Sequence, residues 1–192
     1  MALERANAGI SVSIEYGLTL YQATAMVTRG WALIKQGQAE EAIEQISQGL
    51  DAYQATGTEL LRAHFLGLLA EALGKARRAQ EGLRVLEEAL TIAHRDSERY
   101  YLAELYRLKG ELLLASTVDT AENCFNQAIE IAQQQETKSL ELRAAMSLAQ
   151  LYQNQDRQQE AHDALAPVYE SFTEGFDTTD LREARALIAE LS

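Results

Sequence analysis

The chain has 192 residues and a formal net charge of −12, from 17 basic and 29 acidic side chains, and 47% of its residues are hydrophobic. This length and composition suit a single globular domain that folds without disulfides or metals. The acidic excess argues against nucleic-acid and anionic-membrane binding, both of which require a surplus of Lys and Arg. With Cys124 as its one cysteine, the chain forms no internal disulfide, which favours a cytoplasmic location.

We predict helix almost throughout, because one proline and 11 scattered glycines offer little to interrupt helices or to build the turns of a β fold. The helices follow an internal repeat. The repeated pattern is a small residue, an apolar residue four positions later, and then, three positions further on, a small residue followed by an apolar one. Successive copies of the pattern are 39 or 40 residues apart. The copies of this pattern begin at Ala2, Ala42, Gly82, Ala121 and Ala161.

The first predicted helix, 2–15, stands alone. It carries the repeated pattern at Ala2, Ala6 and Gly9-Ile10, but no helix precedes it to complete a pair, so we interpret residues 1–17 as a half-repeat in a chain that opens in the middle of a repeat. We expect the pattern to face the next pair and the other flank to be unpaired. There Leu3, Ile10 and Ile14 are expected to form an apolar patch that favours an upstream domain, weak dimerisation through residues 1–20, or fraying.

Four helix pairs are predicted next, at 18–36 with 38–54, 58–75 with 78–95, 97–115 with 118–135, and 137–153 with 157–173. They correspond to repeats at about 18–56, 57–96, 97–136 and 137–175. A last helix over 180–191 begins with the capping-box-like Asp180-x2-Glu183 and presents Leu181, Ala184, Ile188 and Leu191 on one face. We interpret 178–192 as the cap that a stack of repeats needs at its end.

The first helix of every pair carries its own small residue within an apolar stripe, at Gly30, Ala70, Gly110 and Ala149. A stripe with apolar positions at i, i+3, i+4 and i+7 covers one face of a helix. A Gly or Ala in that stripe lets the neighbouring helix approach closely. The predicted fold class is therefore all-α, an α-α superhelix of four long antiparallel helix pairs that forms a single domain over 1–192.

The repeat resembles the tetratricopeptide repeat, whose pattern is aromatic-x2-Leu-Gly-x2-Tyr, then Ala-x3-Phe, then Ala. The third copy matches best, with Tyr106, Gly110, Ala121, Phe125 and Ala128. The period exceeds the usual 34 or so by six residues, or roughly 9 Å of helix per pair, and the terminating proline is absent. The period also overlaps the HEAT and armadillo range of about 40–47, but the small residues sit at the tetratricopeptide positions.

Longer stretches resemble the C-terminal repeat region of large bacterial signalling proteins. In those proteins a nucleotide-cyclase or transcription-regulator domain and then a signal-transduction ATPase domain precede the repeats. The stretches that carry this resemblance are RGWAL at 29–33, YRLKGEL at 106–112, KSLELRAA at 138–145 and FTEGFDT at 172–178. The resemblance implies a sensing and scaffolding arm rather than the catalytic part.

The tetratricopeptide resemblance also implies a concave groove lined by the first helix of each pair. Counted from the small residue of each copy, the predicted partner-binding residues are Thr24, Val27, Trp31 and Ile34; His64, Glu71 and Lys75; Glu104, Arg107 and Glu111; and Arg143, Met146, Gln150 and Gln153. Family members that grip a terminal carboxylate use Asn where Trp31, Glu71, Glu111 and Gln150 stand here, so that clamp is not predicted.

Two features admit two interpretations each. Trp31 is either a binding anchor or a residue that packs against the preceding helix. The stretch between Arg157 and Arg182 holds acidic residues and no Lys or Arg. It is either a solvated face or an electrostatic docking surface for another domain or another copy of the chain.

The sequence contains no recognisable catalytic constellation. Gly67 and Gly74-Lys75 are too far apart for a phosphate-binding loop, and no two histidines have the spacing of zinc ligands on a helix. Cys124 has no basic residue or histidine near it in the sequence to lower the pKa of its thiol, so we predict a buried small residue rather than a nucleophile. We therefore predict no enzyme, no catalytic residue, no metal site and no cofactor.

Two functional hypotheses remain. The first is a non-catalytic protein-interaction or sensing scaffold, the C-terminal repeat arm of a bacterial signalling regulator, whose partner is a protein, a peptide or the upstream domains of a longer parent protein. The alternative is a self-associating repeat module that mediates oligomerisation.

Overall fold

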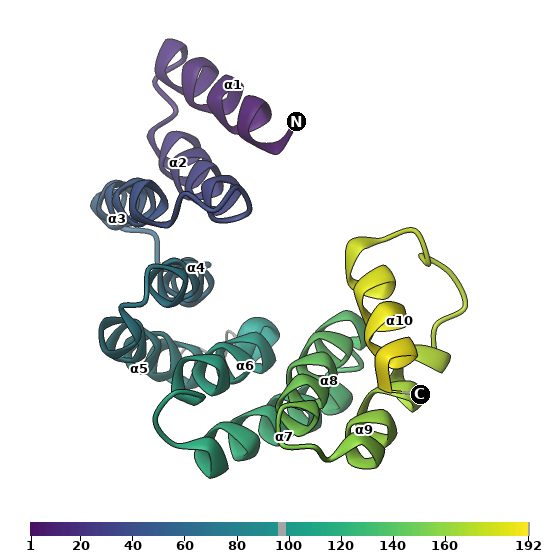
Figure 1. Ribbon diagram of the computed structural model, residues 1–192. Helices are drawn as coiled ribbons and strands as arrows, with labels where there is room; N and C mark the ends of the chain where they lie inside the picture. The colour runs from purple at the N-terminus through teal and green to yellow at the C-terminus, as the bar shows by residue number, and fades with distance from the viewer. Residues whose placement is uncertain (96–98, 192) are drawn as a thin grey trace. The chain divides into compact units, whose positions relative to one another are not determined.

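The computed structural model describes residues 1–95 and 99–191. These residues form ten α-helices and one short 3-10 helix, with no strand among them, so the all-α prediction is confirmed (Figure 1). The helices divide into two compact units, one over Met1–Tyr101 and a second that begins at Leu102. This division falls close to the predicted boundary between the second and third repeats, and the grouping of all repeats into one domain stays a prediction.

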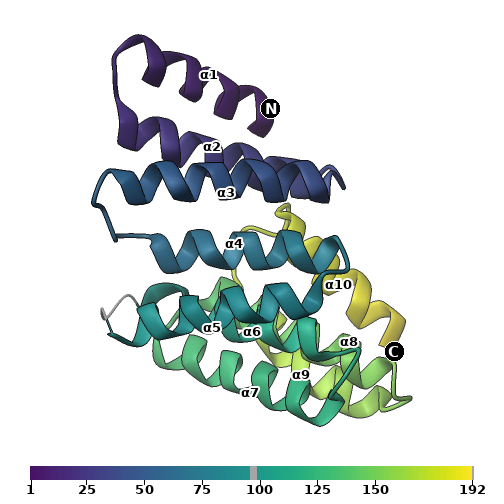
Figure 2. The ribbon, with the colours of Figure 1, turned by 90° about the vertical axis from the view of Figure 1, so that its left-hand side faces the viewer.

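Unit 1 contains α1 (Ala2–Glu15), α2 (Thr19–Ile34), α3 (Ala39–Ala55), α4 (Arg62–Lys75), α5 (Ala79–Arg95) and the 3-10 helix η1 (Arg99–Tyr101). Consecutive helices lie side by side along the unit (Figure 2). The predicted pairs are present as α2 with α3 and α4 with α5, and α1 packs against α2 without a helix ahead of it.

Unit 2 contains α6 (Leu102–Leu113), α7 (Val118–Gln134), α8 (Lys138–Gln153), α9 (Gln158–Glu170) and α10 (Thr179–Leu191). Helix α6 pairs with α7, and α8 pairs with α9. Helix α10 covers α8 and α9 and buries Leu181, Ala184 and Leu187. The cap predicted for the end of the stack is therefore present, with its apolar face toward the last pair.

Small residues bring the paired helices into near-backbone contact. A Cβ added to Gly49 of α3 would lie 2.7 Å from Val27 Cγ2 and 3.1 Å from the Ala23 carbonyl oxygen of α2. A Cβ added to Gly110 of α6 would lie 2.5 Å from the ring of Phe125 on α7. Because real Cβ atoms do not approach other atoms this closely, these positions require glycine, and the predicted role of the small residues is confirmed.

Several helices end in the same left-handed cap. Gly37 has φ +77°, and the Gln38 N–H donates to the Leu33 carbonyl at 3.0 Å, which is the Schellman arrangement. Arg77, Glu136 and Asp156 adopt the same conformation, with φ between 55° and 61°. Each of these non-glycine caps costs on the order of 1 kcal/mol of backbone strain, which the hydrogen bonds of the cap offset.

Two predicted helix starts differ from the structure, and a third cannot be compared with it. Helix α4 begins at Arg62 instead of 58, because Leu61 has φ +70° and the Tyr53 hydroxyl donates to the Leu60 carbonyl and holds the loop open. The predicted start of the third pair at 97 lies outside the described residues, and η1 precedes α6. The capping-box prediction is wrong, because the Thr178 carbonyl accepts the first helical hydrogen bond and Asp180 lies inside α10.

Replacing Gly49 with Ala is expected to lower the free energy of unfolding by about 1–2 kcal/mol, because the clash with α2 outweighs the gain in helix propensity. Gly9→Ala is the matched control. Its Cβ would meet Ala25 Cβ at 3.4 Å, an ordinary contact, so the variant should be neutral or slightly stabilised. Urea unfolding measures both, and a Gly49→Ala variant as stable as Gly9→Ala would contradict the close-contact account.

Candidate functional site

The predicted groove residues of unit 1 divide between the core and the surface. Val27 and Ile34 lie in the apolar core with Leu33 and Ile46, which corrects their assignment to a partner-binding surface. Thr24 is half-buried, and its hydroxyl donates to the Leu20 carbonyl.

Trp31 lies on the exposed side of α2, with 36% of its surface accessible. Lys35, one turn further along, places Nζ 5.8 Å from the centre of the indole ring and donates to Glu71 Oε1 of α4 at 3.0 Å. The side chain of Glu71 is only 9% exposed. A largely desolvated carboxylate therefore links successive first helices next to an exposed tryptophan.

His64 and Lys75 lie elsewhere on α4. The His64 ring is half-buried and packs edge-on against Tyr101, with the ring centres 4.2 Å apart. Lys75 is exposed at the last position of the helix. The two residues therefore lie near opposite ends of α4, with Glu71 between them in the sequence.

In unit 2 four predicted groove residues form one ionic cluster. The Arg107 guanidinium of α6 donates to both carboxylate oxygens of Glu104, at 2.9 and 2.7 Å, and also to Glu111. Arg143 of α8 lies 2.9 Å from the same Glu104 carboxylate. Ser147 of α8, a residue not predicted, accepts from Arg107 and donates to Glu111, both at 3.3 Å.

Burial makes this cluster a structural element. Glu104 is 1% exposed and Arg107 is 6% exposed, and a charge at such depth is tolerated only when opposite charges and hydrogen bonds surround it. The cluster joins α6 to α8, just as Lys35 and Glu71 join α2 to α4.

The remaining predicted residues of unit 2 lie outside this cluster. Met146 lies in the apolar core, which corrects its assignment to a partner-binding surface. Gln150 is exposed and Gln153 is half-exposed.

Cys124 is buried in α7, as the sequence predicts. Burial raises the pKa of its thiol, and the charge of Lys109 on α6 opposes that rise. The sequence argument missed Lys109 because it lies on the other helix of the pair. The net direction keeps the thiol protonated at neutral pH, which is unfavourable for a nucleophile.

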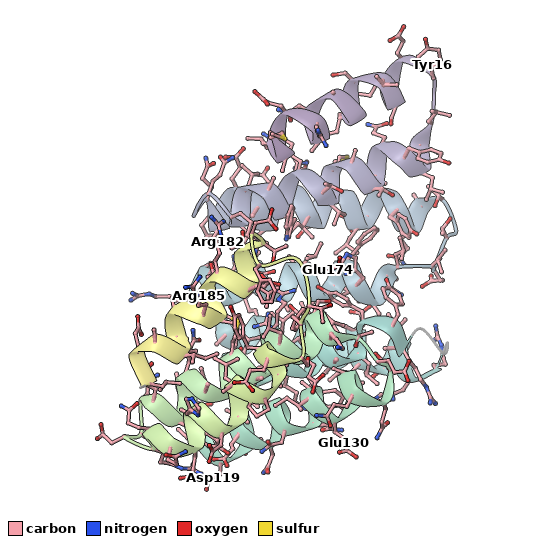
Figure 3. The ribbon with its side chains drawn as sticks, turned by 90° about the vertical axis from the view of Figure 1, so that its right-hand side faces the viewer. Tyr16, Asp119, Glu130, Glu174, Arg182 and Arg185 are labelled. Atoms are coloured by element: carbon pink, nitrogen blue, oxygen red, sulfur yellow. The ribbon has the colours of Figure 1, made fainter. Side chains whose placement is uncertain are left out.

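The acidic stretch between Arg157 and Arg182 covers α9 and the loop that leads to α10. Glu160 pairs with Arg157, and that guanidinium lowers the pKa of the Glu160 carboxyl. Glu174 is exposed in the loop, and Arg182 and Arg185 project from α10 (Figure 3). The stretch is therefore solvated along most of its length.

An apolar groove of about 680 Å³ lies between α1 and α2. Helix α1 contributes Ala2, Arg5, Ala6 and Gly9, and α2 contributes Tyr21, Ala25 and Thr28. The patch predicted from Leu3, Ile10 and Ile14 is on other faces of α1, since none of the three lines the groove and Leu3 packs on the core. We refer to this cavity as the α1–α2 groove.

No helix among the described residues has the length and hydropathy needed to cross a bilayer. No group of three or more His, Cys, Asp or Glu side chains within 1–95 and 99–191 is arranged to hold a metal ion.

Comparison with solved structures identifies the fold. BtubC (BKLC) from P. vanneervenii is 18% identical and superposes with a TM-score of 0.74, covering 100% of this chain and 83% of that one. The TPR-like repeats of a putative kinesin light chain from Podosopora anserina give a TM-score of 0.63 at 21% identity, and a second structure of the same repeats gives 0.65 at 19%; each covers 88% of this chain and 84% of that chain.

The fold is TPR-like. Identities this low establish the fold alone. No protein-family model matches the sequence, and no curated protein does. The TPR-like prediction made from the small-residue pattern is thus confirmed at the level of fold.

Replacing Glu104 with Ala removes the carboxylate shared by Arg107 and Arg143. We expect the free energy of unfolding to fall by about 3 kcal/mol, because the buried Arg107 guanidinium loses both hydrogen bonds to Glu104 and keeps only those to Glu111 and Ser147. Glu88→Ala, which removes one carboxylate from the exposed pair with Arg62, should cost less than about 1 kcal/mol. Equal losses in a urea titration would show that the cluster is no more than a surface ion pair.

The raised thiol pKa predicts slow alkylation of Cys124. At pH 8 the folded chain should react with iodoacetamide more slowly than the urea-unfolded chain, because less thiolate is present and the sulfur is covered. Lys109→Met removes the charge that opposes the rise, so it should slow the folded chain further. If the folded chain reacts with iodoacetamide as fast as the unfolded chain, Cys124 is neither covered nor raised in its thiol pKa, which contradicts the prediction.

Proposed function

We propose that the chain is a non-catalytic protein-binding scaffold whose partner contacts the exposed first-helix surface around Trp31. The observation that carries the proposal is the position of this tryptophan beside the Lys35–Glu71 pair that links α2 to α4. Tryptophan is among the residues that contribute most to interface energy when a partner covers them.

The packing of the underlying helices supports the same proposal. Val27 and Ile34 of α2 share one buried apolar cluster with residues of α4, and the Lys35–Glu71 pair spans the same two helices beside Trp31. A surface that is already ordered loses little conformational entropy on binding, so more of the contact energy appears as affinity. The mixed chemistry of indole, ammonium and carboxylate suits a protein or peptide partner.

The cellular setting that we propose is the cytoplasmic repeat arm of a bacterial signalling regulator. Its support is the sequence resemblance of the stretches at 29–33, 106–112, 138–145 and 172–178. In such an arrangement the repeats bind a partner, and domains elsewhere in a parent protein respond.

Self-association is the second candidate function. It is favoured by the exposed apolar side chains Val12, Ile14 and Tyr16 at the N-terminal end of unit 1, since exposed apolar surface promotes association. The two functions differ in which residues an oligomer or a complex would cover.

The test replaces Trp31 in cells with an aromatic photo-reactive amino acid, which keeps a large ring at this position. A parallel variant carries the same amino acid at Leu60, which is 62% exposed in the α3–α4 loop. A protein that cross-links from Trp31 and not from Leu60 is then purified. Trp31→Ala should weaken its binding about tenfold or more, as loss of a hot-spot residue does, while Leu60→Ala leaves binding unchanged.

Three outcomes would contradict the scaffold proposal. Identical cross-links from both positions would show no preferred surface. Cross-links solely to other copies of the chain would favour self-association. An affinity that survives Trp31→Ala would exclude the tryptophan as an anchor.

A further inference from the structure

A further cavity lies in unit 2, between the first turns of α8 and α10. Its volume is about 410 Å³, within the range of roughly 300–1,000 Å³ that small-molecule sites have. The loop that leads from α9 to α10 forms its third wall (Figure 1). All of the walls come from residues between 138 and 181, so the cavity is complete within unit 2. We refer to it as the α8–α10 pocket.

The floor of the pocket is apolar. Leu142 of α8 and Leu181 of α10 line it, with only 1% and 4% of their surfaces accessible. The half-buried ring of Phe172 lines it as well. Gly175 has φ +78° and brings the loop close to the floor, because a Cβ added there would lie 3.7 Å from Leu181 Cδ1. An apolar group of a ligand that covers this floor removes apolar surface from water, which favours binding.

The α8 side of the pocket carries hydrogen-bond donors. Lys138, at the first position of α8, donates from Nζ to the Ser171 carbonyl at 2.8 Å, which uses one of the three donors of its ammonium group. Ser139 supplies a hydroxyl next to it. The Thr137 hydroxyl donates to the Ala132 carbonyl instead of capping α8. The positive end of the helix dipole therefore adds to the Lys138 charge, and this side favours a carboxylate.

The α10 side of the pocket carries carboxylates. Asp180 is half-buried in the first turn of α10, and Glu174 is exposed in the loop (Figure 3). Neither forms an ion pair with a residue that the structure describes, whereas Glu160 of α9 is paired with Arg157. This side of the pocket therefore favours an ammonium group.

The two sides together specify the charges of the ligand. A simple anion would be repelled by Asp180 and Glu174, and a simple cation would be repelled by Lys138. A zwitterion with an apolar group places each charge against its opposite and covers the floor. An α-amino acid has these three groups on one carbon atom.

We propose that the α8–α10 pocket binds a free α-amino acid with an apolar side chain. Lys138 holds its carboxylate, Asp180 holds its ammonium group, and the apolar floor contacts its side chain. The pocket and Trp31 belong to different units, so this proposal does not depend on the proposed partner surface. Amino-acid binding adds a sensing role to a non-catalytic repeat domain.

The test compares L-leucine with two molecules that each lack one of its charged groups. Isoamylamine is leucine without the carboxylate, and isocaproic acid is leucine without the ammonium group. In two-dimensional NMR titrations of the full chain, leucine should saturably shift the amide signals of Ser139, Thr173 and Gly175, which line the pocket. Each truncated molecule should bind about tenfold or more weakly, because a charge-assisted hydrogen bond is lost.

Two variants assign the two charges. Lys138→Met should weaken leucine about fivefold or more without weakening isoamylamine, because the amine has no carboxylate for Lys138 to hold. Asp180→Asn should weaken leucine by a similar factor without weakening isocaproic acid. Asp163→Asn is the matched control, because this carboxylate is exposed on α9 outside the pocket, and it should leave all three affinities unchanged.

The truncated molecules separate binding from folding. Lys138 also tethers the loop, and Asp180 stands in the first turn of α10, where a carboxylate stabilises a helix. A pocket that had merely loosened would lose the truncated molecule together with leucine. Thr173→Trp tests the location without changing a charge, since its ring should fill the pocket and remove the leucine shifts, with an unchanged circular dichroism spectrum.

Any of three results overturns the proposal. The first is no saturable shift of the pocket amides with leucine. The second is isoamylamine or isocaproic acid that binds as tightly as leucine, which would assign the pocket to a ligand with a single charge. The third is a leucine affinity that is insensitive to both Lys138→Met and Asp180→Asn.

Discussion

Side chains no larger than a methyl group at the helix contacts set the distance between paired helices, and the rest of the structure depends on that distance. At Gly30, Gly49 and Gly110 the facing helix is so close that even one added carbon would collide with it. Alanine takes this role at Ala42, Ala121 and Ala161, which are fully buried. Close contact allows each pair to exclude water with short side chains, and the larger residues that flank the contact, such as Ile46 and Phe125, fill the remaining space.

Once the pairs have formed, polar contacts join one first helix to the next. Lys35 and Glu71 do so in unit 1, and Glu104 with Arg143 does so in unit 2. In each pair the carboxylate is the less exposed partner. An offset of one residue between the helices would leave that carboxylate without its partner, so the pairs favour one arrangement of the helices.

The sequence predicted the features that depend on local periodicity. The small residues, the helix pairs and the cap follow from spacing along one chain segment, and the structure has them.

The sequence interpretation misplaced Val27, Ile34 and Met146 on a binding surface. Adjacent helical positions differ by about 100°, so counting from one residue does not determine which side of the helix faces the core. It missed the Glu104 cluster and the nearness of Lys109 to Cys124, since those contacts depend on how two helices rotate against each other. The left-handed caps at Arg77, Glu136 and Asp156 are not marked by a glycine in the sequence. Arg77 nevertheless continues the 20-residue step of Gly17, Gly37 and Gly57, and Glu136 and Asp156 are again 20 residues apart.

The central claim, that steric closeness at the small residues determines the pairing, is tested most directly by a double-mutant cycle on Gly110 and Phe125. A Cβ at Gly110 would lie 2.5 to 2.9 Å from three atoms of the Phe125 ring, so Gly110→Ala should destabilise the native chain. In a Phe125→Leu background the ring is absent and the same substitution should cost much less, which gives a coupling free energy of about 1–2 kcal/mol in urea unfolding. Additive effects of the two substitutions would contradict the account.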